Sequence, residues 1–222
     1  IDKEGFCSVI MEGRGLPAKA AFPDSFSYGN EAVETVSYDP EGAKKLLEES
    51  GWKDTDGDGC ADKDGQKLTI DWLTYPTRLE QPKLAEYAQA TLKEIGIDVV
   101  VNNTSDHMTY AADGNFDVYV SSTTTAPTGD PEYFFTSTVV GPKNYGKYEN
   151  KEVTALTEKL HQAFEPEERA KLATELQQKI LDDDGFFFVS HLNMGIVTKS
   201  NVKGMAAHPC DYYEITADLD VE

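Results

Sequence analysis

Segments that favour helix and segments that favour strand alternate along the first half of this chain. Asp39 and Pro40 predict a helix start, because aspartate caps free backbone N–H groups and proline is tolerated in the first helical turn. Gly51 ends that helix, and the alternating residues 68–72 then predict a strand. The order continues with a helix at 82–95 and strands at 97–101 and 116–120. Strands interleaved with helices at uneven spacing indicate an α/β domain with a short mixed sheet flanked by helices.

Two more helices are predicted in the second half by apolar residues spaced three and four positions apart. Pro166 separates them, and their apolar residues are Val153, Leu156, Leu160 and Phe164, then Leu172, Leu176 and Ile180. The second helix should end at 182–184, where three aspartates oppose the negative end of the helix dipole. A buried strand is predicted to begin at 186–189 and to continue toward Val197.

Less regular segments complete the chain. The predicted elements are a first helix capped by Asp2 with Phe6, Val9 and Ile10 as its apolar stripe, a loop over 18–36, a short helix near 107–112 and an irregular tail from Met205. There is no internal repeat and no linker long enough to divide the chain.

Composition excludes several classes of partner. The chain has 40 acidic and 20 basic residues and a net charge of −20, which repels phosphate backbones and anionic membrane surfaces, so we expect no nucleic-acid partner. The three cysteines are far apart and odd in number, which predicts neither a disulfide framework nor a structural zinc site. No apolar run approaches the length of about 20 residues that spans a bilayer.

Several segments, in order along the chain, resemble those of the peptide- and nickel-type (family 5) solute-binding proteins of ABC importers. The most specific is the run from Tyr38 to Trp52 together with the turns that follow it at 54–59 and 64–65. It is similar to the family pattern YDPxxAKxLLxxxGW followed by DGDG and DG. Gly42 departs from this pattern, because a helix former is usual there. Weaker resemblances lie at residues 1–18, 129–131, 144–150, 167–180 and 202–213.

The resemblance implies a type II periplasmic-binding-protein-like fold, in which two lobes close over a ligand. This chain aligns with the C-terminal lobe only. We therefore expect residues 1–222 to be a single C-terminal lobe, a fragment from which the N-terminal lobe is absent. A start at Ile1, with neither methionine nor a signal peptide, agrees with this expectation.

The same resemblance implies the substrate-binding component of an ABC importer. Such a protein captures nickel, as a chelate, or oligopeptides outside the membrane and delivers them to the membrane permease. The cargo stays open between the two, although the tail and residues 129–135 lean toward nickel. We expect a monomer located in the periplasm or lipid-anchored on the outer face of the cell membrane through the full-length protein.

The predicted contact strip for the ligand is the polar run 121–130. It follows a predicted strand, and α/β sheets present ligand sites at the carboxyl ends of their strands. Its hydroxyl and amide groups can bond a peptide backbone or the carboxylates of a chelate. The predicted ligand-binding residues here are Thr123, Thr124, Thr125, Thr128 and Asp130. The alternative is an ordinary polar connector.

Three aromatic residues, Tyr133, Phe134 and Tyr145, are predicted as walls of the cleft, and the alternative for each is a place in the core. Some nickel-type relatives carry an aromatic residue and a tyrosine in the contact strip, where this chain has Thr125 and Gly129. That departure argues against transferring a specific nickel-chelate geometry to this chain.

Two metal sites are conceivable, and we expect no required cofactor. Asp54, Asp56 and Asp58 fit the opening of a calcium loop, but the twelfth position, which should be an acidic bidentate ligand, is Gly65. The alternative is a tight turn that feeds a hairpin. His208, close to Cys210 and Asp211, is a weaker candidate ligand.

Enzymatic activity has no support in the sequence. The motifs GxSxG and HExxH, the P-loop and the dinucleotide fingerprint are all absent. The leading hypothesis is therefore passive ligand binding, and the alternative is a secreted, calcium-stabilised interaction module centred on residues 54–58.

Overall fold

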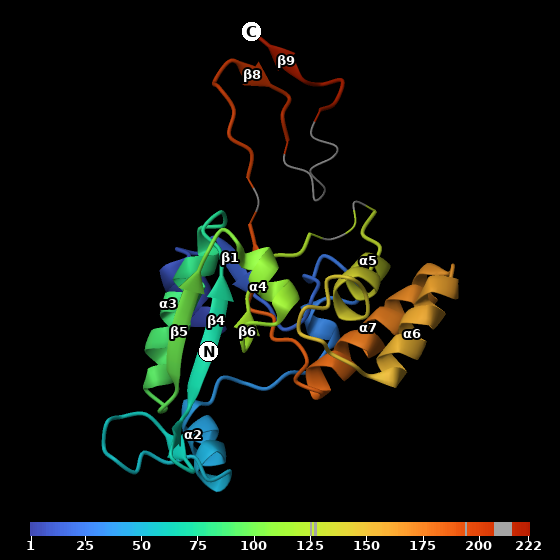
Figure 1. Cartoon of the computed structure of the whole chain (residues 1–222). Helices are drawn as coiled ribbons and strands as arrows, with labels where there is room; N and C mark the ends of the chain where they lie inside the picture. Colours follow the sequence, from blue (N-terminus) through green and yellow to red (C-terminus); the bar gives the residue numbers. More distant parts are fainter. Residues whose placement is uncertain (125, 127, 194, 207–214) are drawn as a thin grey trace. The chain divides into compact units, whose positions relative to one another are not determined.

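The structure is a computed structural model, and it describes residues 1–222 except 125, 127, 194 and 207–214 (Figure 1). These residues form two compact units. Unit 1 comprises residues 1–13, 36–122 and 145–147, and unit 2 comprises residues 14–35, 123–144 and 148–222. No helix among the described residues is long and apolar enough to cross a membrane.

Unit 1 is built on a three-stranded parallel sheet. Strands β4 (Thr69–Thr74), β5 (Asp98–Asn103) and β6 (Val118–Tyr119) lie in the order β5-β4-β6. Helix α3 (Glu80–Lys93) joins β4 to β5 and packs beside them, and α4 (His107–Asp113) joins β5 to β6 (Figure 1). Because the strands are parallel, their carboxyl ends share one edge of the sheet. All these elements were predicted, with boundaries within about two residues.

Helix α2 (Pro40–Glu49) begins at its predicted cap. Asp39 Oδ1 accepts a 2.9 Å hydrogen bond from Gly42 N, and Pro40 occupies the first helical position. Gly51, with a φ of +91°, follows the end of the helix. No residue of α2 is buried, and Leu46 is 65% exposed, so the helix has little packing to stabilise it.

The first predicted helix is divided into two turns of different geometry. Helix α1 (Lys3–Gly5) is capped by Asp2 as predicted, and it continues as a π-helical turn, η1 (Phe6–Ile10). Phe6 is buried, but Val9 is 72% exposed. The wider π-helical turn moves Val9 off the face that carries Phe6, which corrects the predicted apolar stripe.

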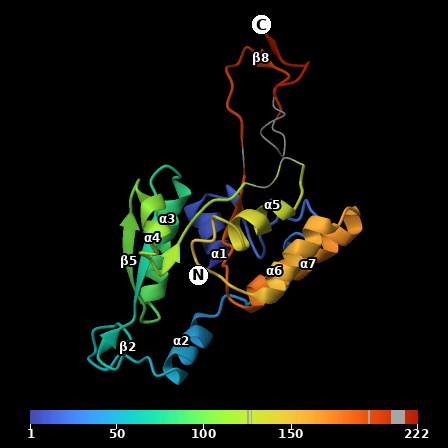
Figure 2. The same cartoon turned by 45° about the vertical axis from the view of Figure 1, so that its right-hand side comes forward.

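Unit 2 has its core around two long helices, α6 (Lys151–Gln162) and α7 (Pro166–Asp182), which lie side by side (Figure 1 and Figure 2). The predicted apolar residues Val153, Leu156, Leu160, Leu172, Leu176 and Ile180 are all buried. Phe164 was predicted wrongly, since it is 87% exposed. Helix α6 ends before it, because a residue close to Pro166 is disfavoured in helical geometry, and Ala163 fills the core instead.

A helical segment before α6 was not predicted. It consists of α5 (Glu132–Phe134) and a π-helical turn, η3 (Phe135–Val139). Phe134, Phe135 and Val139 are buried in the same core as α6 and α7. A short 3-10 turn, η2 (Asn30–Ala32), interrupts the predicted loop over 18–36.

The predicted strand from 186 toward 197 is wrong over most of its length. Among the described residues of this range, only β7 (Ser190–Leu192) forms, pairing antiparallel with β1 (Gly15–Pro17), and Val197 is 99% exposed. The partner strand is only three residues long, and a single further backbone bond, from Ala18 N–H to the Val189 carbonyl, continues the pairing beyond it.

Two small antiparallel pairs complete the described elements. In unit 1, β2 (Asp62–Lys63) and β3 (Gln66–Lys67) form a hairpin whose turn residues, Asp64 and Gly65, both have positive φ. In unit 2, β8 (Val202–Lys203) pairs with β9 (Asp220–Val221), so two residues near the end of the tail that was predicted irregular form a strand.

Candidate functional site

The predicted contact strip 121–130 ends on the surface of unit 2. Thr123, Thr124 and Thr128 are exposed there, so their hydroxyl groups are accessible to a ligand. Thr125 lies outside the described residues. Asp130 is only partly exposed, and its carboxylate is paired within unit 2 with Arg169.

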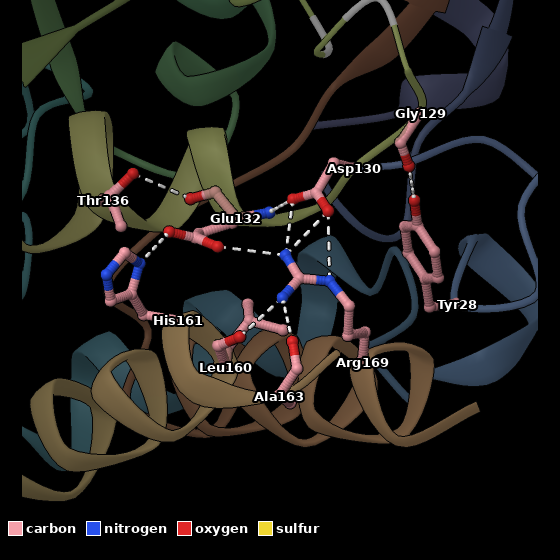
Figure 3. Close-up of polar contacts among 9 residues, drawn as sticks. All are labelled: Tyr28, Gly129, Asp130, Glu132, Thr136, Leu160, His161, Ala163 and Arg169. Carbon is pink, nitrogen blue, oxygen red and sulfur yellow. Dashed lines mark hydrogen bonds and ion pairs between the residues drawn. The ribbon is translucent and has the colours of Figure 1, made fainter. Parts of the chain in front are cut away.

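Arg169, on α7, is the centre of a polar network that holds the end of the strip (Figure 3). Its Nε donates to Asp130 Oδ2 at 3.0 Å, and its Nη2 donates to both Asp130 oxygens at 2.7 and 2.8 Å. Nη2 also donates to Glu132 Oε2 at 3.0 Å. A guanidinium fork matches a carboxylate in this two-nitrogen geometry, which is among the stronger hydrogen-bonding arrangements in proteins.

The remaining nitrogen of Arg169 anchors the network to α6. Nη1 donates to the carbonyl oxygens of Leu160 and Ala163 at 2.7 and 2.6 Å. These carbonyls lie at the C-terminal end of α6, where helical carbonyl groups lack intrahelical partners. All three guanidinium nitrogens are therefore occupied, and the side chain is only 16% exposed.

Glu132 links the network to His161, which extends from α6 (Figure 3). Glu132 Oε1 lies 2.6 Å from His161 Nδ1, and the His161 side chain is 73% exposed. Burial raises the pKa of Glu132, but hydrogen bonds from His161 and Arg169 outweigh this and lower it. For Arg169, burial lowers the pKa, but its hydrogen bonds to Glu132 and Asp130 raise it overall.

Gly129 is fixed from the other side by Tyr28, whose hydroxyl donates to the Gly129 carbonyl (Figure 3). Burial, and then the charge of Asp130, raise the pKa of Tyr28 to about 12, so the hydroxyl keeps its proton. Gly129 has a φ of +72°, and a Cβ there would lie 2.7 Å from the Phe26 ring. Both the conformation and the close contact require glycine at this position.

The predicted aromatic walls have different surroundings. In unit 2, Tyr133 is 47% exposed, and Lys143 Nζ lies 5.7 Å from its ring centroid. Phe134 is 7% exposed and packs edge-on against Phe22 and Phe135, so it occupies the core, the alternative left open for it. Tyr145 belongs to unit 1.

Tyr145 joins an aromatic cluster that the sequence did not reveal. Its ring lies 5.8 Å from that of Tyr119, and Tyr119 OH lies 2.8 Å from His107 Nδ1. The His107 ring stacks on Tyr75 at 4.1 Å. Tyr75 follows β4, His107 begins the helix after β5, and Tyr119 ends β6, so the cluster marks the carboxyl edge of the sheet, where α/β folds bind ligands.

The acidic loop of unit 1 brings three predicted ligands together. Carboxylate oxygens of Asp54, Asp56 and Asp58 lie within 4.8 Å of one another, and all three residues are exposed. Both oxygens of Asp54 already accept backbone N–H groups, from Gly57 and Gly59. Lys67 Nζ contacts Asp58 and lies 3.4 Å from Asp56. These contacts are those of a turn closed by a lysine, and calcium binding stays a prediction. His208 lies outside the described residues.

Arg169 and Tyr28 could not have been identified as site residues from sequence spacing. Arg169 contacts Asp130, which is 39 positions away, and Tyr28 contacts Gly129, which is 101 positions away. Tyr75, His107 and Tyr119 of unit 1 had a usable signal. Each follows or ends a predicted strand, which is the position where side chains reach the carboxyl edge of a parallel sheet.

Comparison with known proteins gives a consistent result. A family model described as bacterial extracellular solute-binding proteins, family 5 Middle, matches residues 1–146. The oligopeptide-binding protein AppA of Bacillus subtilis is 28% identical over 97% of this chain and 41% of its own length. The nickel-binding protein NikA of Staphylococcus aureus is 26% identical over 100% of this chain and 44% of its own length. The chain thus spans less than half the length of these relatives.

Solved structures agree in fold. AppA from Bacillus subtilis, in complex with a nonapeptide, superposes with a TM-score of 0.79 at 25% identity, covering 96% of this chain and 44% of that chain. NikA from Staphylococcus aureus, in complex with Ni(L-His)2, superposes with a TM-score of 0.78 at 25% identity, covering 100% of this chain and 46% of that chain. NikA from Brucella suis superposes with a TM-score of 0.84, covering 100% of this chain and 46% of that chain. At 22% identity, this match shows similarity of fold only.

Proposed function

Because this chain belongs to the family 5 bacterial extracellular solute-binding proteins, we propose that it is part of the substrate-binding component of an ABC importer. In this proposal the longer protein captures an oligopeptide or a nickel chelate outside the membrane and passes it to the membrane permease. It acts by binding, without chemical turnover. The family is extracellular by description. We propose further that the longer protein is a monomer, and that it lies in the periplasm or is anchored by lipid to the outer face of the cell membrane.

The observation that carries this proposal is a match along the whole chain to relatives named for oligopeptide and nickel binding. The exposed hydroxyls of Thr123, Thr124 and Thr128 offer neutral hydrogen-bonding groups. Such groups suit a peptide backbone or the carboxylates of a chelate, and both cargo classes therefore stay in the proposal.

We further propose that residues 1–222 form one lobe and that the rest of the longer protein supplies the other side of the site. Relatives more than twice as long as the matched segment support this proposal. If a complete site bound its ligand with a Kd of about 1 μM, half of that free energy would correspond to a Kd of about 1 mM. We therefore expect weak binding by the 222-residue chain alone.

An NMR titration of the 222-residue chain tests these proposals. The probes are Ni(L-His)2 and a pool of nonapeptides, each raised to millimolar concentration. We expect shifts at the amides of Thr123, Thr124 and Thr128, and weaker shifts in Thr124→Val and Thr128→Val. Thr198→Val, which removes an exposed hydroxyl elsewhere in unit 2, is the matched control. Absence of shifts for both probes would refute ligand contact by the strip, and a Kd of micromolar or tighter would refute the single-lobe proposal.

A further inference from the structure

The end of the contact strip is held by contacts from three directions within unit 2. Arg169 of α7 grips both carboxylate oxygens of Asp130 at 2.7–3.0 Å. Tyr28, from the segment before η2, donates its hydroxyl to the Gly129 carbonyl. Asp130 Oδ1 in turn accepts from the Glu132 N–H at the start of α5, at 2.8 Å. Gly129 and Asp130 are therefore tied to α7, to α5 and to the segment before η2.

Arg169 is itself held rigidly. Two of its contacts are carbonyls at the end of α6, and the part of α7 that follows it is packed in the core through Leu172 and Leu176. Glu132 receives a second contact from His161. A guanidinium with all three nitrogens engaged and a side chain 16% exposed has no freedom to bind a ligand directly.

We propose that Arg169 is a positioning residue for the contact strip: by clamping Asp130 to α7 and α6, it fixes the backbone of Thr128 and Gly129 and so sets ligand affinity without contacting the ligand. Asp130 shares this role, because its charge is matched by Arg169 and is not available to a cationic group of the cargo. The inference builds on the proposed binding function.

Amide hydrogen exchange measured by NMR tests the clamp directly. The Gly129 N–H bonds the Ala126 carbonyl at 2.8 Å and the Glu132 N–H bonds Asp130, so the exchange of these two amides reports the order of the clamped segment. Arg169→Lys keeps the charge but loses the fork. Loss of charge-assisted hydrogen bonds should accelerate exchange at these amides on the order of tenfold to a hundredfold, while interior amides of α7 stay unchanged.

The matched control is Lys179→Gln. Lys179 lies on α7 like Arg169, and this substitution removes its ion pair with Glu152 of α6. Exchange at the Gly129 and Glu132 amides should stay unchanged. If Arg169→Lys does not fold, Asp130→Asn decides, since it keeps the shape of the side chain and removes the charge that Arg169 holds. Unchanged exchange at Gly129, or equal acceleration throughout unit 2, overturns the proposal.

Titration of the same variants with Ni(L-His)2 and the nonapeptide pool separates the clamp from the proposed function. We expect affinity to fall at least threefold in Arg169→Lys and to stay unchanged in Lys179→Gln. Faster local exchange with unchanged affinity overturns the positioning role. If the wild-type chain binds neither probe, the proposed binding function fails, while the exchange measurement still decides whether Arg169 orders the segment.

Discussion

At the scale of single residues, Gln177 connects α7 to the irregular segment that crosses it. Its side chain is fully buried, accepts from Ala21 N at 3.1 Å and donates to the Tyr28 carbonyl at 2.8 Å. Gln177→Leu would leave these two backbone groups without partners. Since each such loss costs about 1–3 kcal/mol, we expect the free energy of unfolding to fall by about 2–6 kcal/mol, measured by urea denaturation.

Gln178 provides the matched control for this prediction. It makes the same kind of contact one position later, with the N–H and the carbonyl of Glu34, but its bonds are exposed to solvent. Water replaces them when the amide is lost, so Gln178→Leu should cost about 1 kcal/mol or less. Equal costs for the two variants would contradict the assignment of Gln177 as a buried connector.

His191 predicts a pH dependence of stability. Its Nε2 lies 3.0 Å from Asn30 Oδ1, and burial lowers its pKa from the usual value of 6.5, with Asp24 opposing the shift. The unfolded chain therefore binds a proton at a higher pH than the folded chain. The stabilisation is complete above pH 6.5 and decreases as the pH falls toward the lower folded pKa.

Urea denaturation at pH 7.5, 6.5 and 5.5 should show this loss, and His191→Gln should flatten the profile. His161→Gln, at an exposed histidine on α6, is the comparison variant. If the free energy of unfolding depends on pH as steeply in His191→Gln as in the wild-type chain, groups other than His191 cause the pH dependence.

At the scale of elements, α2 depends on its cap because none of its residues is buried. A Cβ on Gly42 would lie 2.3 Å from Asp39 Oδ2, so the capping carboxylate must shift to accommodate it. Gly42→Ala should therefore stabilise α2 by less than the roughly 1 kcal/mol that helix propensity predicts. In an Asp39→Ala background the full gain should appear, as measured by exchange of the α2 amides. Equal gains in both backgrounds would refute this coupling.

Helices were predictable from the sequence where local signals agreed. Caps, periodic apolar residues and a following glycine or proline located α2, α3, α6 and α7, because each signal acts within a few residues. The strand at 186–197 failed because strand length depends on a partner, and β1 offers three residues. The π-helical turns were missed because their apolar spacing fits neither the α-helical nor the strand period.

The candidate site was predictable only in part. The polar strip was located by its place after a strand, and three of its threonines are exposed. The partners of Asp130 were not predictable, since Arg169 reaches it only after α6 and α7 have packed together. Local sequence indicates which segments carry polar groups, whereas tertiary contacts decide which groups are free to bind.

At the scale of the whole chain, the net charge of −20 should make stability depend on salt. Mutual repulsion among the acidic residues disfavours compact states, and salt screens it over about 8–10 Å near physiological ionic strength. Sodium chloride should therefore raise the melting temperature. A screening effect on the order of 1 kcal/mol corresponds to about 2–4 °C for a chain of this length.

Calcium provides the sharper form of this prediction, because the acidic loop would respond to calcium but not to sodium if it were a binding site. Lys67 pairs with Asp58 and lies near Asp56, and both oxygens of Asp54 are engaged by backbone N–H groups. We therefore expect calcium to raise the melting temperature no more than magnesium does at equal ionic strength. Lys67→Gln removes the competing ammonium and should increase the response to calcium. A calcium-specific rise in the wild-type chain that Asp56→Asn abolishes would instead support the calcium-stabilised module.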